Sequence, residues 1–305
     1  MYKIKATNEW FIDAPWGKIA LISWGDPSGT PVLLVHGRQD SAATFIPLLE
    51  HLPDSYYYVG VDLPGHGQSD PLPIGPMLTR LHFLVAVEYA LRHLNWDQFV
   101  FIGHSMGCEQ GLFCNRIYPG KITKFIFLDP LPSLQRLQIH NYEEYYRSFY
   151  KEYYSKYKRY NHDDRVYSKR KVLEAVMRNR GLNENQAELV LSRNLHCIGE
   201  DLYKLAWDKR LKFPAPQNYP VDYYIDLFSK FLPPTLIISA SNSLHLDLRE
   251  RNEKALLIVR ELQKNTDYFF VETVTGGHDV HLTDSESVAR CVLGFLSKTM
   301  KKAKL

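Results

Sequence analysis

Short runs of apolar residues recur along the chain, and most of them end near a glycine or an aspartate. Runs of this length without polar alternation are typical of strands that are buried on both faces of a parallel sheet. They predict strands at residues 31–35, 56–61, 99–102, 122–128, 235–239 and 268–274. Ahead of them, two apolar and aromatic stretches flank Ala14-Pro15-Trp16-Gly17 and predict an N-terminal hairpin.

Segments between these runs carry apolar residues at helical spacing. The clearest is 78–94, whose apolar residues recur with a period close to 3.6. Similar patterns predict helices at 106–118, 255–262 and 287–296. Strands that alternate with helices indicate β-α-β units and a mostly parallel sheet, which binds its ligands at the carboxyl ends of the strands.

The alternation stops between Leu131 and Pro233, where no run predicts a parallel strand. Nine tyrosines lie between residues 142 and 167, and a run of lysines and arginines extends from 151 to 171. We expect residues 131–233 to form a helical cap, inserted into a core made of residues 1–130 and 234–305. The basic run is either a solvated helix face or a surface that attracts an anionic ligand.

Composition is that of a globular protein, with 45% apolar residues in a chain of 305. The formal charge of +3 gives no reason to expect a nucleic-acid partner, and no apolar run reaches the ~18 residues of a membrane span. The first five residues lack the apolar stretch of a secretory signal, so we expect a protein that is not secreted. The four cysteines form no metal-binding pattern, and we expect buried free thiols, no metal site and no cofactor.

Gly103-His104-Ser105-Met106-Gly107 follows a predicted strand and opens a predicted helix, which is the context that gives G-x-S-x-G its meaning. Glycines flank a turn that is too tight for side chains, and the turn holds the serine out above the sheet. A serine hydroxyl needs a base to become a nucleophile. We assign Ser105 as the nucleophile and His278, in the loop after the last strand, as its base; His281 and His245 are alternatives.

The anion that forms when a serine attacks a carbonyl group needs hydrogen-bond donors. The main-chain N–H of Met106, directly after the nucleophile, is one candidate. The other is Arg38, which follows the predicted strand that ends at His36-Gly37. We expect Arg38 to act through its main chain rather than its guanidinium. Alternatively, His36-Gly37 is only a turn that ends a strand.

These motifs resemble those of the α/β hydrolases that carry a helical cap. The resemblance rests on His36-Gly37, Asp62-Leu63-Pro64-Gly65-His66-Gly67, the turn around Ser105 and Gly277-His278. The segments 36–45 and 277–282 are most similar to the serine hydrolase-like (Kraken-like) family. The resemblance covers nearly the whole chain except the cap, and it implies an α/β-hydrolase fold and a Ser-His-acid triad.

The acid of the triad departs from the pattern of many relatives, which carry it after the strand predicted at 235–239. Here that turn reads Ala240-Ser241-Asn242-Ser243, without a carboxylate. Asp129 and Asp247 are the substitutes, and a neutral Asn242 or Ser243 is a third possibility. We favour Asp129 because a residue at the end of a strand is held rigidly, although it could instead be a turn cap before Pro130. Asp62 is expected to be structural.

The sequence therefore predicts a serine hydrolase that cleaves a small-molecule carboxylic ester through an acyl-enzyme. Ser105 argues against relatives of this fold that use a carboxylate as the nucleophile. The alternatives are an acyl-thioester (acyl-CoA) hydrolase, a non-catalytic protein that keeps the fold, and a protein that interacts through its tyrosine-rich cap. The final Ala303-Lys304-Leu305 resembles a peroxisomal signal, so we expect a peroxisomal import receptor as partner, or else a cytoplasmic location.

Overall fold

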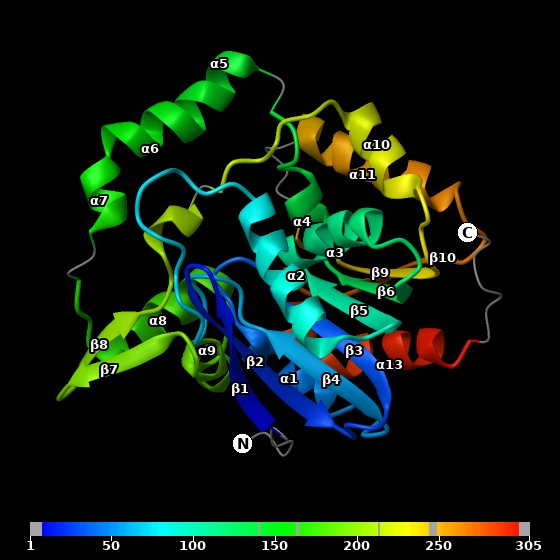
Figure 1. Cartoon of the computed structure of the whole chain (residues 1–305), viewed down its shortest axis with the longest axis horizontal. Coiled ribbons are helices and arrows are strands. Elements are labelled where there is room, and N and C mark those ends of the chain that lie inside the picture. Colours follow the sequence, from blue (N-terminus) through cyan, green and yellow to red (C-terminus); the bar gives the residue numbers. More distant parts are fainter. Residues whose placement is uncertain (1–7, 140, 163–164, 213, 244–248, 299–305) are drawn as a thin grey trace.

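A computed structural model describes residues 8–139, 141–162, 165–212, 214–243 and 249–298. One sheet of eight strands forms its centre (Figure 1), in the order β1-β2-β4-β3-β5-β6-β9-β10. The bounds are β1 Asn8–Ala14, β2 Gly17–Gly25, β3 Thr30–Val35, β4 Tyr56–Val61, β5 Phe99–His104, β6 Ile122–Leu128, β9 Thr235–Ala240 and β10 Phe269–Val274.

The first two strands are antiparallel to their neighbours, and every pair from β4 onwards is parallel. The predicted hairpin, the predicted strands and the mostly parallel sheet are therefore confirmed. Alternate residues of one strand pack on opposite sides of the sheet: Leu33 and Val35 lie in one apolar cluster, and Val32 and Leu34 lie in another. Burial on both faces explains why the run in this strand is unbroken.

Helices cover both faces of the sheet (Figure 1). The cluster that holds Leu33 includes side chains of α2, α3 and α11, whereas the cluster that holds Leu34 includes side chains of α1 and α13. The bounds of the core helices are η1 Ala42–Phe45, α1 Ile46–Leu49, α2 Leu81–Leu94, α3 Met106–Ile117, α11 Arg249–Gln263, α12 Val280–Thr283 and α13 Ser285–Leu296. The four predicted helices correspond to α2, α3, α11 and α13.

The start of α2 differs from the prediction, because the helix begins at Leu81 and not at Leu78. Thr79 forms a parallel bridge with Ala215 instead, and the amide of Ala215 donates to the carbonyl of Leu78 at 2.9 Å. The amide of Arg80 donates in turn to the carbonyl of Ala215 at 3.1 Å. A strand-like contact with a segment distant in sequence thus replaces the first helical turn.

The chain between β6 and β9 forms the segment that we call the cap. Its elements are α4 Leu131–Leu134, α5 Tyr142–Tyr145, the π-helix η2 Tyr146–Lys151, α6 Glu152–Ser155, α7 Tyr157–Asn161, α8 Lys169–Arg180, α9 Glu184–Leu191, β7 Leu195–Gly199, β8 Leu202–Leu205, the 3-10 helix η3 Lys209–Lys212 and α10 Val221–Ser229. In Figure 1, α5 to α7 form an arch set apart from the sheet.

We had expected a helical cap. The cap is not wholly helical, however, because β7 and β8 form an antiparallel pair of their own. Both strands are short and largely exposed, so they lack the buried apolar run by which the sheet strands are recognised. Cys197, on β7, is exposed and Cys291 is partly exposed, whereas Cys108 and Cys114 are buried. All four thiols are free, but the expectation that all are buried was wrong.

Some predictions fall on residues that the structure does not describe. His245 and Asp247 lie outside the described residues, and so does Ala303-Lys304-Leu305, so the peroxisomal address stays a prediction. Within the part of the chain that is described, no helix has both the length and the apolar character needed to cross a bilayer.

One ion pair joins the cap to the core through a buried carboxylate. Asp62 is fully buried, and its side chain accepts hydrogen bonds from the amides of Ala42 (2.8 Å) and Gln68 (2.9 Å). Arg193 follows α9 in the cap, and its Nε donates to Asp62 at 2.8 Å. Asp62 is therefore structural, as expected, because it holds two loops of the core and one of the cap.

We predict that Arg193→Met destabilises the protein by about 3 kcal/mol, because removal of one partner leaves a buried carboxylate without its cation. Urea unfolding at neutral pH measures the change. Arg92→Met is the matched control: Arg92 pairs with Glu88 on the exposed side of α2, and its loss should cost less than about 1 kcal/mol. Equal effects of the two substitutions would contradict a role of the Asp62 pair in holding the cap.

Candidate active site

Ser105 lies in the sharp turn between β5 and α3, with φ of 52° and ψ of −116°. The turn depends on its glycines. A Cβ added to Gly107 would lie 2.0 Å from the carbonyl oxygen of Val35, and one added to Gly103 would lie 2.7 Å from the amide nitrogen of Cys108. Helix α3 therefore approaches β3 more closely than side chains would allow. Ser105 is held in a strained conformation at the carboxyl edge of the sheet, directly after β5.

Three predicted side chains meet at this edge although they lie far apart in the sequence. Nε2 of His278 is 2.9 Å from Oγ of Ser105, and Nδ1 of His278 is 2.6 Å from Oδ2 of Asp129. Ser105 follows β5, Asp129 follows β6, and His278 follows β10. The strands are parallel, so these three positions lie at the same end of the sheet.

Asp129 is fully buried and has a second set of partners. Its Oδ1 accepts hydrogen bonds from the amide of Ala240 (3.1 Å) and from Oγ of Ser243 (3.0 Å). Ser243, which we had considered as a neutral substitute for the acid, thus contacts Asp129 rather than His278. The amide of Asn242, the other neutral candidate, donates to the carbonyl of Gly276 at 2.9 Å and holds the loop before His278.

The loop after β3 lies against the same turn. A Cβ added to Gly37 would lie 3.1 Å from Cβ of Ser105, so the segment that leads to Arg38 passes next to the serine. The guanidinium of Arg38 donates to the carbonyl of Lys212 in the cap at 2.9 Å. Burial, with help from Arg136 and Arg80, lowers the pKa of Arg38 to about 10, which leaves it charged at neutral pH. Met106 is the first residue of α3, where amides have no partner within the helix.

Residues 30–285 match the family model described as the alpha/beta hydrolase fold. The chain belongs to the α/β-hydrolase family. This match confirms the fold that the motifs around Ser105 and His278 predict.

Known relatives agree with this assignment. The human "Serine hydrolase-like protein 2" is 30% identical over 303 residues, which cover 96% of this chain and 95% of the relative. The "Probable serine hydrolase" of Drosophila melanogaster is 24% identical and covers 95% of this chain and 88% of its own length. A hypothetical protein from Pseudomonas aeruginosa has a similar structure, with a TM-score of 0.77, 23% identity and coverage of 95% and 99%. The predicted likeness to serine hydrolase-like proteins is confirmed.

In this α/β hydrolase a cluster of buried polar side chains packs behind Ser105 and His278. Nε2 of His104 is 3.1 Å from the carbonyl oxygen of His278, and the His104 ring lies 4.1 Å from that of His281. Burial lowers the pKa of His281 to about 3, so its imidazole is neutral at physiological pH. His281, which the sequence left open as an alternative base, is fully buried between His104 and Phe45.

Arg180, the last residue of α8, was missed by the sequence analysis. Its Nε donates to Oδ2 of Asp279 at 2.8 Å, and its Nη2 contacts both Asp279 and Oδ2 of Asp40, the latter at 3.2 Å. Asp279 is next to His278, and Asp40 lies two residues after Arg38. One guanidinium from the cap therefore holds the two core loops that flank Ser105. An arginine at the end of a basic helix looks like a surface residue in the sequence, so no local signal identifies it.

Burial and the guanidinium have opposing effects on the two acids. Burial raises the pKa of Asp40 to about 6 although Arg180 acts against it. Burial also opposes the ionisation of Asp279, but there the hydrogen bonds and charge of Arg180 prevail and lower the pKa. Without Arg180 both carboxyls would lie buried without a cation.

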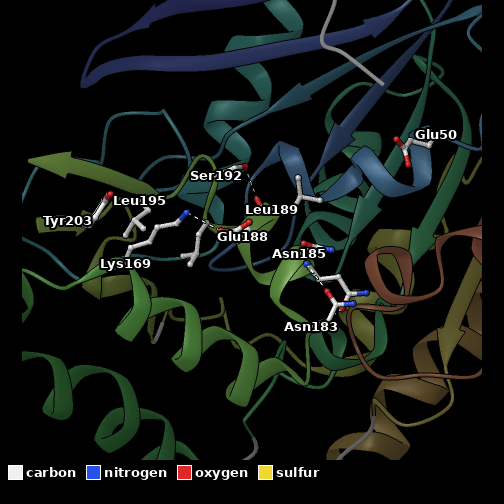
Figure 2. Close-up of a pocket in the computed structure, with 11 residues that line it drawn as sticks. Glu50, Lys169, Asn183, Asn185, Glu188, Leu189, Ser192, Leu195 and Tyr203 are labelled. Atoms are coloured by element: carbon white, nitrogen blue, oxygen red, sulfur yellow. Dashed lines mark hydrogen bonds and ion pairs between the residues drawn. The ribbon is translucent and has the colours of Figure 1, made fainter. Parts of the chain in front are cut away.

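A separate cavity of about 770 Å³ opens between α8, α9 and β8 of the cap and Glu50 of the core (Figure 2). Lys169 and Glu188 line it and form an ion pair at 3.0 Å. Ser105, Asp129 and His278 are not among its lining residues. We therefore do not assign this cavity to the reacting groups.

We predict that Arg180→Met destabilises the protein more at about pH 8 than at about pH 5. Without the cation, the pKa values of Asp40 and Asp279 in the folded state rise above the unfolded value of roughly 3.9. When an acid has a higher pKa in the folded than in the unfolded state, the protein loses stability as pH rises from the unfolded to the folded pKa. Urea unfolding at both pH values should show a deficit of about 3–5 kcal/mol at the higher pH.

Arg178→Met serves as the control, because Arg178 is exposed two residues earlier on the same helix. It should change the free energy of unfolding by less than about 0.5 kcal/mol at either pH. A deficit of the Arg180 variant that is independent of pH would mean that the two carboxyls do not respond to the guanidinium.

Proposed function

We propose that the chain is a serine hydrolase that cleaves carboxylic esters through an acyl-enzyme. The observation that carries this proposal is the continuous chain of hydrogen bonds from Asp129 through His278 to Ser105, at 2.6 and 2.9 Å. The absence of an acid after β9 was the one feature of the sequence that favoured a non-catalytic protein. Asp129, at hydrogen-bond distance from His278, weakens that alternative.

Acylation follows from the orientation of these groups. Oγ of Ser105 attacks the carbonyl carbon, and its proton passes to Nε2 of His278. The main-chain N–H groups of Met106 and Arg38 are proposed to donate to the oxyanion that develops. When the tetrahedral intermediate collapses, the bond to the alkoxy oxygen breaks, and His278 donates the proton to the leaving alcohol.

Deacylation repeats the sequence with water as the nucleophile. His278 takes a proton from the water molecule as its oxygen attacks the acyl carbon, and then returns the proton to Ser105 as the carboxylic acid leaves. Asp129 accepts the hydrogen bond from Nδ1–H throughout and stabilises the imidazolium that forms in each half of the reaction. No redox step or additional reactant is required.

We predict that Ser105→Ala lowers ester turnover by on the order of 10³-fold or more and abolishes covalent labelling by a fluorophosphonate probe. The assay uses simple esters of graded acyl length together with the probe. His278→Ala, which keeps the serine but removes the base, should also label slowly. Labelling of Ser105→Ala at the rate of the unmodified protein would refute the proposal. So would the absence of both labelling and turnover in the unmodified protein.

Asp129→Asn should lower turnover by on the order of 10⁴-fold near neutral pH. The asparagine amide would donate to Nδ1, so that His278 would present Nε2–H to Ser105 and could not accept its proton. Ser243→Ala is the matched control, because it removes one hydrogen bond to Asp129 and keeps the carboxylate. It should lower the rate by less than about tenfold. A small effect of Asp129→Asn would transfer the role to another residue, of which Asp247 is the first to test.

A further inference from the structure

The geometry of the cap points to a membrane-docking surface: we infer that the exposed tyrosines and lysines of α5 to α7 bind a bilayer that contains anionic phospholipids. The five tyrosines concerned form what we call the outer tyrosine row, which consists of Tyr142, Tyr146, Tyr150, Tyr154 and Tyr157. This inference goes beyond the proposed ester hydrolysis and does not depend on it.

The helical run from α5 to α7 carries aromatic residues on two sides, and one side packs against the rest of the molecule. The inner face carries Phe149, Tyr153 and Tyr160, which pack with Met77 and Ala215. The hydroxyl of Tyr153 donates to the carbonyl of Gly75 at 2.5 Å. Tyr145 likewise donates to the carbonyl of Pro216 at 3.1 Å. These contacts attach the run to the rest of the molecule.

The outer tyrosine row is exposed along its whole length, although the rings of Tyr150 and Tyr157 also contact Tyr145 and Tyr153, with centroids 5.9 Å apart in each pair. Relative exposure ranges from 38% for Tyr150 to 75% for Tyr142. Two pairs of rings are nearly parallel: Tyr146 and Tyr150 have centroids 6.1 Å apart at 6°, and Tyr154 and Tyr157 have centroids 6.2 Å apart at 7°. Exposed aromatic rings gathered in this way on a surface mark an interaction site more often than a solvated face.

Exposed basic residues are interspersed with the row along the sequence. Arg147, Lys151 and Lys158 each come directly after a tyrosine of the row, and all three are exposed. Residues 142–161 contain five basic and three acidic side chains, an excess of two positive charges. Two of the acids already have basic partners within the run, since Glu143 pairs with Arg147 and Glu152 with Lys156. The remaining excess lies mainly at the C-terminal end, in Lys151, Lys158 and Arg159.

This combination matches the interface of an anionic bilayer. Tyrosine rings lie readily at the level of the headgroups, with the apolar ring toward the acyl chains and the hydroxyl in water. Lysine and arginine stems are apolar and let the charge reach the phosphates. The run spans 20 residues with a break at Lys156, between α6 and α7, and it forms an arch that stands apart from the sheet (Figure 1). Because this arch projects from the core, its exposed strip is accessible to a surface as large as a bilayer.

Single-stranded nucleic acid also stacks on tyrosine and contacts lysine through its phosphates. The near-neutral charge of the whole chain does not favour it, because nucleic-acid binding sites are strongly basic over a wider surface. We therefore argue for the bilayer and treat a polynucleotide as an outcome of the test.

The test is co-sedimentation of the full chain with vesicles of phosphatidylcholine, with and without phosphatidylglycerol. We expect binding to the mixed vesicles at low salt, much weaker binding to phosphatidylcholine alone, and a decrease as salt screens the charges. Substitution of Tyr146, Tyr150 and Tyr154 by Ser should lower the partition coefficient by about tenfold or more, because interfacial binding scales with the apolar area that is inserted.

Matched controls distinguish an effect of this surface from the effect of removing any exposed tyrosine or any basic side chain. Tyr219→Ser with Tyr223→Ser removes two tyrosines that are exposed outside the strip, at 43% and 49%. It should leave binding unchanged. Lys151→Gln with Lys158→Gln should lower binding about fivefold for each charge, whereas Arg92→Gln with Arg290→Gln should have little effect. Thermal unfolding checks that each variant is folded.

Three results would overturn the inference: no binding to the mixed vesicles at low salt, equal losses in the strip variants and their controls, or binding of an oligonucleotide through these tyrosines without binding of vesicles. Ser105 takes no part in the measurement. Failure here would therefore leave the proposed hydrolysis intact, and failure of the hydrolase assay would not affect the vesicle result.

Discussion

Three buried carboxylates at the carboxyl edge of the sheet are paired with cations, and these pairs determine how the cap is held. An ionised carboxylate away from water costs several kcal/mol unless it is paired and hydrogen-bonded. Arg193 supplies the cation for Asp62, and Arg180 supplies it for Asp40 and Asp279. Both arginines belong to the cap and all three acids belong to the core. The cap is therefore part of the electrostatics of the core rather than only a cover.

The same pairing of a buried carboxylate with a cation links the turn around Ser105 to the start of the cap. Glu109, four residues after Ser105, is fully buried, and burial raises its pKa. It pairs with Arg80 and accepts a hydrogen bond from Oγ of Ser133 in α4 at 2.8 Å. Helix α3, which begins directly after the serine, is thus fixed at its first turn to the residues that precede α2 and to α4. Loss of the pair between Glu109 and Arg80 would therefore disturb the position of Ser105 through α3.

The sequence predicts what is encoded locally. The strands, the turn around Ser105 and the loop with His278 are each recognisable from a few adjacent residues. The proposed acid was left open because its identity depends on which carboxylate the sheet brings to His278. Among the described residues, Asp129, 149 residues away along the chain, lies within hydrogen-bond distance of it. Arg180 had no signal at all, because its partners come from two distant loops. The β7–β8 pair was missed because exposed strands lack a buried apolar run.

Two parts of the cap are held by different forces. Helices α8 and α9 share an apolar cluster that includes Val176, Val190 and Leu282, the last in the short helix just after His278, and Arg180 adds its ion pairs to this contact. The run from α5 to α7 rests on a much smaller cluster around Met77 and Tyr153 and on a few hydroxyl contacts. Local opening costs less where fewer apolar groups are buried. Displacement of α5 to α7 therefore breaks fewer contacts than displacement of α8 and α9, and it leaves the guanidinium of Arg180 in place beside the loops that carry His278 and Arg38.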